Sequence, residues 1–135
     1  MAALDQTDGS DLRFELSDWR AGTTGPPILF LHGLAGSGRY WAERVQPLAS
    51  NFRPFMPDLL GFGRSPWPRM NYTVDIHVAA IRQYVEHAGL AQERLTLVGH
   101  SLGGILAIEY AARYQANGLL AFNLPCYASA DEARR

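Results

Sequence analysis

The chain has 135 residues, of which 47% are hydrophobic and 19% charged, so it has the length and composition of one globular domain. Twelve Lys and Arg residues against 13 Asp and Glu residues leave a formal charge of −1, and neither sign forms a long run. This balance predicts no binding to nucleic acid and none to an anionic membrane surface.

Residues 1–13 are polar and acidic and contain no apolar stretch of the kind that a secretory signal requires. No apolar run approaches the length that crosses a bilayer. Cys126 is the single cysteine, which excludes an internal disulfide and a zinc site built from several cysteines. These features predict a cytoplasmic protein without a cofactor or bound metal, in which Cys126 is a small apolar filler.

Alternating apolar residues over 12–19 predict a half-buried strand. The continuous apolar run 28–31 is typical of a strand that is buried on both faces, as in a parallel sheet. A glycine-rich loop over 33–38 follows, and apolar residues at helical spacing predict a helix over 41–48.

Residues 52–58 resemble a second strand, although each of their two prolines removes a backbone donor. Over 73–88 the apolar residues step by four and three positions, which predicts a helix. Thr73 is a suitable N-cap for it, and Gly89 stands where a helix commonly ends.

Residues 95–98 predict a further buried strand, followed after Gly99 by a helix of small residues over 102–114 and a last strand over 118–122. Strands that alternate with helices indicate an α/β fold with a mostly parallel sheet and flanking helices. Near the end of the chain, Ser129 and the acidic residues after it are typical of the start of another helix.

The segment Gly99-His100-Ser101-Leu102-Gly103 matches the pattern G-x-S-x-G at a predicted strand-to-helix junction. A turn this sharp leaves no room for side chains two positions before and after the serine, which explains the glycines. The start of a helix also favours developing negative charge on the serine oxygen. We therefore predict that Ser101 is a catalytic nucleophile; the alternative is a serine that only caps the helix.

Two further motifs make the sequence resemble the α/β-hydrolase family. His32-Gly33 after the first buried strand is similar to the family's oxyanion loop, and residues 58–65 are similar to its D-x-x-G-x-G-x-S loop. With the G-H-S-L-G-G form of the serine motif at 99–104, they stand in the family's order and at about its spacing. The resemblance covers roughly residues 12–125.

This resemblance implies that the backbone N–H groups of Leu34 and Leu102 form an oxyanion hole for the tetrahedral transition state. It also implies loop-organising roles for His32, Asp58 and His100. Asp58 is expected to accept hydrogen bonds from backbone N–H groups.

Substrate contacts are expected from Gly33, Leu34, Trp41 and Phe62, with a small molecule as the substrate. The remaining histidines, His77 and His87, lie on the predicted helix over 73–88, and we expect them to face solvent.

An activated serine needs a histidine base and a carboxylate that orients it, which in this family follow the serine along the chain. No histidine follows Ser101, and Asn123 stands where some family members carry the acid. We therefore predict that residues 1–135 are the N-terminal portion of a single domain, that a helical lid begins at about residue 125, and that this piece alone is inactive. The strand over 118–122 would then be an exposed sheet edge, which would pair with the missing half or with another chain.

The reaction that these features favour is hydrolysis of an ester or a related activated carbonyl through an acyl-serine. Epoxide hydrolases and haloalkane dehalogenases of this fold have an aspartate where Ser101 stands. A nucleotide-binding module is a second interpretation, because residues 33–40 approach G-x-x-x-x-G-K-[ST], but Arg39 and Tyr40 replace the two chemistry-bearing residues. A non-catalytic relative that uses the fold for binding is the third.

Overall fold

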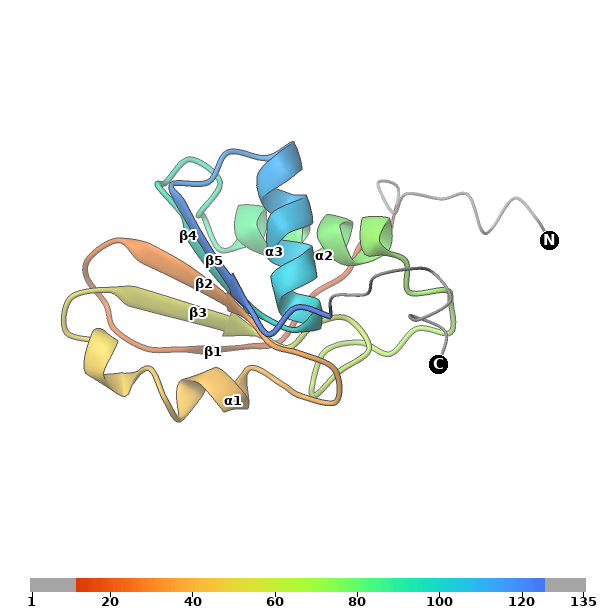
Figure 1. Cartoon of the computed structure of the whole chain (residues 1–135), viewed down its shortest axis with the longest axis horizontal. Coiled ribbons are helices and arrows are strands. Elements are labelled where there is room, and N and C mark those ends of the chain that lie inside the picture. The colour runs from red at the N-terminus through yellow and green to blue at the C-terminus, as the bar shows by residue number, and fades with distance from the viewer. Residues whose placement is uncertain (1–11, 126–135) are drawn as a thin grey trace.

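The computed structural model describes residues 12–125, which form a five-stranded sheet with helices on both faces (Figure 1). The predicted α/β fold with a mostly parallel sheet is confirmed. The elements are β1 (Asp18–Arg20), β2 (Pro27–Leu31), α1 (Arg39–Ala42), the 3-10 turn η2 (Gln46–Leu48), β3 (Arg53–Pro57), α2 (Val74–His87), β4 (Thr96–His100), α3 (Leu102–Arg113) and β5 (Gly118–Phe122).

The strands lie in the order β1-β3-β2-β4-β5. β1 is antiparallel to β3, and every other pair is parallel. Because parallel strands point the same way, the loops that follow β2, β3, β4 and β5 all leave from one edge of the sheet. Within the described residues β5 is an edge strand, and Leu119 and Leu120 are 44% and 58% exposed.

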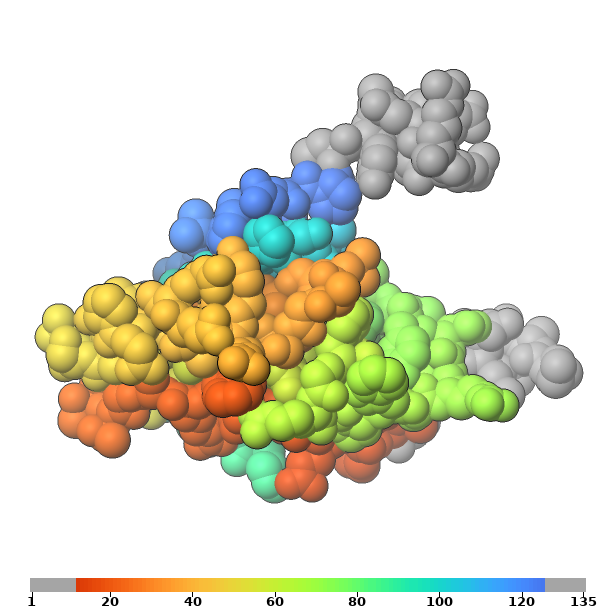
Figure 2. All heavy atoms as spheres, turned by 90° about the horizontal axis from the view of Figure 1, so that it is seen from below, coloured from red at the N-terminus to blue at the C-terminus, as the bar shows by residue number. Residues whose placement is uncertain are grey.

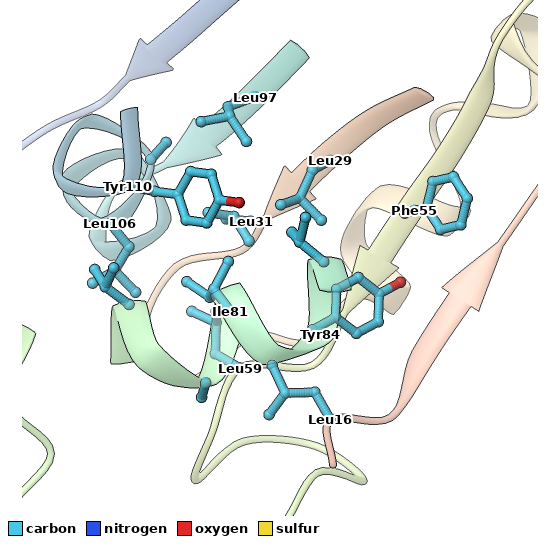
Figure 3. Packing of buried hydrophobic residues seen from close by; sticks show 14 of the residues in the cluster. Leu16, Leu29, Leu31, Phe55, Leu59, Ile81, Tyr84, Leu97, Leu106 and Tyr110 are labelled. Carbon is cyan, nitrogen blue, oxygen red and sulfur yellow. The ribbon is translucent and has the colours of Figure 1, made fainter. Parts of the chain in front are cut away.

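β2 is buried along its whole length because helices cover both sides of it. Leu29 and Leu31 point into the larger cluster under α2 and α3, where Leu97 and Leu106 also lie (Figure 3). On the other face of the sheet, Ile28 and Phe30 of β2 pack with Trp41, Val45 and Met56. The continuous apolar run in the sequence therefore reflects two cores, one on each side of the sheet.

The helix predicted over 73–88 is α2, and its ends are where the sequence places them. The Thr73 hydroxyl accepts a hydrogen bond from the Ile76 N–H at 3.2 Å, so Thr73 is the N-cap. Gly89 has φ +77, the left-handed conformation that glycine adopts most easily after a helix.

The helix predicted over 41–48 is wrong, because the structure has two short pieces there, α1 and η2. Val45 between them leaves the helical conformation, with φ −97 and ψ 3. Pro47 contributes to the break, because it has no N–H to donate to the carbonyl of Glu43 four residues earlier. The apolar spacing nevertheless serves packing, because Trp41 and Val45 are buried.

The strand predicted over 12–19 is shorter than expected and begins only at Asp18. Upstream of it, side chains take the backbone hydrogen bonds that a neighbouring strand would have taken. Phe14 N–H donates to Gln83 Oε1 at 2.8 Å, and Ser17 N–H donates to Ser65 Oγ at 2.9 Å. Alternate burial remains, with Leu16 in the core.

The strand-like segment with two prolines is β3, an interior strand of the sheet. Its ends are held by the residues next to the prolines, since Arg53 N–H donates to Pro26 O and Asp58 N–H donates to Ser17 O. The Pro54 carbonyl also accepts from Ala21 N–H. The pairing thus tolerates the missing donors.

His77 is buried, at 5% exposure, so its predicted solvent-facing position is wrong; His87 is exposed as predicted. Cys126, the helix start at Ser129 and most of the predicted lid entry lie outside the described residues. Among residues 12–125, no helix is long and apolar enough to cross a membrane.

Candidate active site

Ser101 occupies the single-residue turn between β4 and α3. Its backbone has φ 54 and ψ −119, a conformation that costs a non-glycine residue about 1–3 kcal/mol. Its N–H donates to the carbonyl of Phe122 at 3.0 Å, which fixes the turn to the end of β5. The surrounding structure therefore holds Ser101 in a strained position at the carboxyl edge of the sheet.

The two glycines of the serine motif are required by close backbone contacts. A Cβ atom on Gly103 would collide with the carbonyl oxygen of Leu31, and one on Gly99 would collide with the carbonyl of Gly103. The steric reason that the sequence suggested is confirmed by this packing. As a result α3 packs closely on the end of β2, and Ser101 lies at the carboxyl ends of β2 and β4.

α3 begins directly after Ser101, so its first backbone N–H groups lie close to this residue. Ser101 O accepts hydrogen bonds from Gly104 N–H at 2.9 Å and from Ile105 N–H at 3.2 Å, which starts the helix. Leu102 is the first helical residue, and a residue in that position has no partner for its N–H within the helix. Leu102 therefore presents a backbone donor beside Ser101, at the positive end of the helix dipole.

The loop after β2 lies against the same turn. A Cβ atom on Gly33 would be 3.1 Å from Ser101 Cβ and 3.0 Å from His100 Nδ1, so a larger residue would push these neighbours back by a few tenths of an ångström. Leu34 follows directly and is 70% exposed. In Figure 2, the 32–38 segment (orange) lies between the start of α3 (cyan) and the 61–70 loop (lime).

His32 is fully buried and links two loops through its ring. Nδ1 lies 2.7 Å from the carbonyl of Gly33, and Nε2 accepts the N–H of Leu59 at 2.9 Å. This pair of bonds requires a neutral ring with its proton on Nδ1. Burial also lowers the pKa of His32, and both nitrogens are used, so the ring holds the loops together and is not free to act as a base.

Asp58 is 1% exposed and connects the same two loops, those that follow β2 and β3. Its carboxylate accepts the N–H of Gly38 at 2.7 Å and the N–H of Arg64 at 2.8 Å. The Arg64 side chain adds a positive charge, with Nε 3.7 Å from Oδ2. The backbone hydrogen bonds expected of Asp58 are present, and together with those of His32 they set the shape of the loop that carries Leu34.

Ser65 is a residue whose role the sequence did not reveal. It is 3% exposed, its hydroxyl donates to Asp58 O, and its oxygen accepts the N–H of Ser17. Ser65 thus joins the 58–65 loop to the segment before β1. The sequence signal that could have indicated this role is its place as the last residue of the D-x-x-G-x-G-x-S motif.

The other residues that the sequence singled out lie at different depths. His100 stacks on Tyr40, with ring centroids 5.6 Å apart, and also contacts Phe122. Phe62 meets His32 edge-on at 5.4 Å and is partly exposed. Trp41 is buried in the core at 7% exposure, so its ring lies below the site and not on its surface.

Backbone strain gathers at this edge of the sheet. Among residues 12–125, three non-glycine residues have positive φ: Ala35 at 57, Ser101 at 54 and Asn123 at 52. They follow β2, β4 and β5 respectively, so all three belong to loops at the carboxyl edge. Strain of this kind persists where the fold imposes it and is concentrated at functional sites.

The described residues contain no group that could serve as the base for Ser101. His32 and His77 are buried, His87 is at the far end of α2, and the structure has no hydrogen bond between His100 and the Ser101 hydroxyl within residues 12–125. Over the same range there is no cluster of three or more His, Cys, Asp or Glu residues that could hold a metal.

A surface groove of the described residues lies away from Ser101. It is formed by the segment before β1 and by one side of α2, and Phe14, Val78, Arg82 and Arg113 contribute to it. Arg82 pairs with Glu86, and Arg113 pairs with Asp75. Since Arg82 and Arg113 are already paired with carboxylates, we assign no ligand to this groove.

A family model described as "alpha/beta hydrolase fold" matches residues 26–120, from β2 through most of β5. The chain belongs to the α/β-hydrolase family. The region matched by the family model includes the Ser101 turn and both loops that His32 and Asp58 link.

Curated relatives match the same part of the α/β-hydrolase chain. A Mycobacterium tuberculosis (strain ATCC 25618 / H37Rv) protein named as uncharacterized is 36% identical over 96 residues, 71% of this chain and 28% of that protein. "Probable lysophospholipase BODYGUARD 3" of Arabidopsis thaliana is 42% identical over 92 residues, 64% of this chain and 18% of that protein. The chain therefore spans less than a third of the length of these relatives.

Solved α/β-hydrolase structures are also similar. A thermophilic esterase from Thermogutta terrifontis has a TM-score of 0.79 at 28% identity, covering 90% of this chain and 44% of that one. An epoxide hydrolase from Bacillus megaterium has a TM-score of 0.75 at 31% identity, covering 83% and 40%. These neighbours are hydrolases, which supports hydrolysis in general and leaves the type of bond open.

Proposed function

We propose that this chain supplies the nucleophile and the oxyanion donors of a serine hydrolase that cleaves an ester or a related activated carbonyl through an acyl-serine. The observation that carries the proposal is the Ser101 turn. A serine at positive φ stands at the start of α3, next to the Leu102 N–H, which has no partner within the helix, and against the loop that bears Leu34.

In the proposed reaction the Ser101 oxygen attacks the carbonyl carbon while its proton passes to a histidine base. The carbonyl oxygen becomes an oxyanion and accepts hydrogen bonds from Leu102 N–H and Leu34 N–H, which together stabilise the tetrahedral intermediate. Collapse of this intermediate releases the alcohol, which takes up the proton from the histidine, and water then hydrolyses the acyl-serine.

The histidine and its orienting carboxylate would come from chain outside residues 1–135, since none of the four histidines is placed to serve. We therefore propose that the 135-residue piece alone is inactive. Serine at position 101, where related epoxide hydrolases have an aspartate, favours esters over epoxides. Nucleotide binding is disfavoured, because the Asp58 carboxylate already accepts the N–H of Gly38 at the start of α1.

Labelling by a fluorophosphonate tests the proposal, because this reagent reacts with activated serines. The full-length protein should be labelled, Ser101→Ala should abolish labelling, and Ser50→Ala, at an exposed serine outside the site, should leave it unchanged. The 135-residue piece should react about 10³-fold more slowly or not at all, since it lacks the base. Undiminished labelling of Ser101→Ala would disprove the assignment of the nucleophile.

A further inference from the structure

Asn123 stands beside Ser101 at the carboxyl edge of the sheet. The register of β4 and β5 pairs His100 with Phe122, so Ser101 and Asn123 are the next residues along two neighbouring parallel strands. Neighbouring strands are about 4.8 Å apart. The hydrogen bond from Ser101 N–H to Phe122 O, at 3.0 Å, fixes this distance where both strands end.

The backbone conformation at position 123 does not by itself require asparagine. Its φ of 52 lies in the left-handed region, where asparagine is tolerated and glycine is preferred. Glycine would therefore satisfy the backbone at least as well. Asparagine adds an exposed carboxamide, and no hydrogen bond holds that group within residues 12–125.

The groups around Ser101 are otherwise mainly apolar or already paired. Leu34 and Phe62 present apolar side chains, and the His32 ring is committed to Gly33 and Leu59. The Asn123 amide offers two N–H donors and an oxygen acceptor at the end of the strand beside Ser101. Asn123 therefore brings an exposed polar side chain to the strand end next to that of Ser101.

Accepting the ester hydrolysis proposed above, we propose that Asn123 is a substrate-contacting residue that sets specificity. Its side-chain N–H donates a hydrogen bond to a polar atom of the substrate close to the scissile carbonyl. The enzyme therefore favours esters with an oxygen atom near that carbonyl, such as alkoxy or hydroxy acyl esters, over purely hydrocarbon esters of the same size.

A matched pair of substrates tests this role in the full-length protein. 4-Nitrophenyl methoxyacetate and 4-nitrophenyl butyrate have acyl groups of equal length, in which an ether oxygen replaces one methylene. Asn123→Gly keeps the positive φ and removes only the amide. It should lower kcat/KM for the methoxyacetate by about 3- to 10-fold, the range of one neutral hydrogen bond, and should change kcat/KM for the butyrate by less than about twofold.

Asn123→Ala controls for the backbone, because it removes the amide and also strains the turn. It should show the same preference for the butyrate as Asn123→Gly, together with a lower melting temperature. Equal effects of Asn123→Gly on both substrates, or no effect on either, would overturn the role of Asn123. Loss of hydrolysis in Ser101→Ala alongside unchanged kinetics in Asn123→Gly would leave the proposed reaction standing and reject only this inference.

Discussion

The imidazole of His77 lies inside the molecule, although its position on α2 suggested an exposed face. The ring stacks on Tyr72 with centroids 5.8 Å apart, and its Nδ1 has no hydrogen-bond partner in the described part of the chain. Burial lowers the pKa of His77, and the nearby ring of His32 lowers it further. Proton uptake by the folded state is therefore unfavourable.

Because the folded pKa is lowered, the unfolded chain binds a proton at about pH 6.5 while the folded chain does not. The free energy of unfolding should be highest above pH 6.5 and fall as the pH decreases toward 5. His77→Phe keeps a ring against Tyr72 and removes this titration, so its urea-unfolding free energy should fall less steeply over the same range. One such group contributes at most about 1.4 kcal/mol per pH unit. Identical slopes in the two proteins would contradict the explanation.

The packing of α3 on β2 depends on a residue without a side chain. At Gly103 the helix backbone meets the Leu31 carbonyl, and the same contact places Ser101 at the sheet edge. Helix propensity alone would favour alanine at this position, since glycine costs a helix interior about 1 kcal/mol. The contact between elements therefore outweighs the preference of the element itself.

Gly103→Ala should lower the free energy of unfolding by about 1–3 kcal/mol or more, because the methyl group forces α3 away from β2. Denaturant titration followed by circular dichroism measures this change. Gly118→Ala is the control, since a Cβ atom there would meet only the Thr96 side chain at 3.5 Å. A destabilisation no larger than that of the control would show that α3 adjusts without strain.

At the scale of the whole molecule, the described sheet ends in an open strand. β5 pairs with β4 on one side only, and Leu119 and Leu120 on it are exposed. An exposed edge strand with apolar side chains offers unpaired backbone groups to another strand. Under the proposal that further chain completes the domain, we expect that chain to cover β5.

The 135-residue piece should consequently self-associate as its concentration rises, which sedimentation velocity would measure. Leu120→Lys places a charge on the exposed strand and should shift the population toward monomer. Val74→Lys, at a position 37% exposed on α2, provides a charge-matched control that should leave association unchanged. A wild-type piece that stays monomeric at every concentration would contradict this prediction.

The sequence by itself determined the features that depend on neighbours along the chain. Thr73 and Gly89 mark the two ends of α2 in the sequence, because capping is a local interaction. The apolar run of β2 likewise predicted a strand that is buried on both faces. The serine motif predicted a sharp turn because Gly99 lies against the backbone of Gly103, four residues along the chain. The turn at Ser101 is therefore readable without any structure.

Only the tertiary structure decided which distant residues meet. Pairing of Gln83 with the segment before β1 replaces most of the strand predicted there, and a loop packed over α2 buries His77. The approach of Gly33 to Ser101 and the register that brings Asn123 beside it depend on strand order. Such contacts join residues tens of positions apart, and no local pattern encodes their distance.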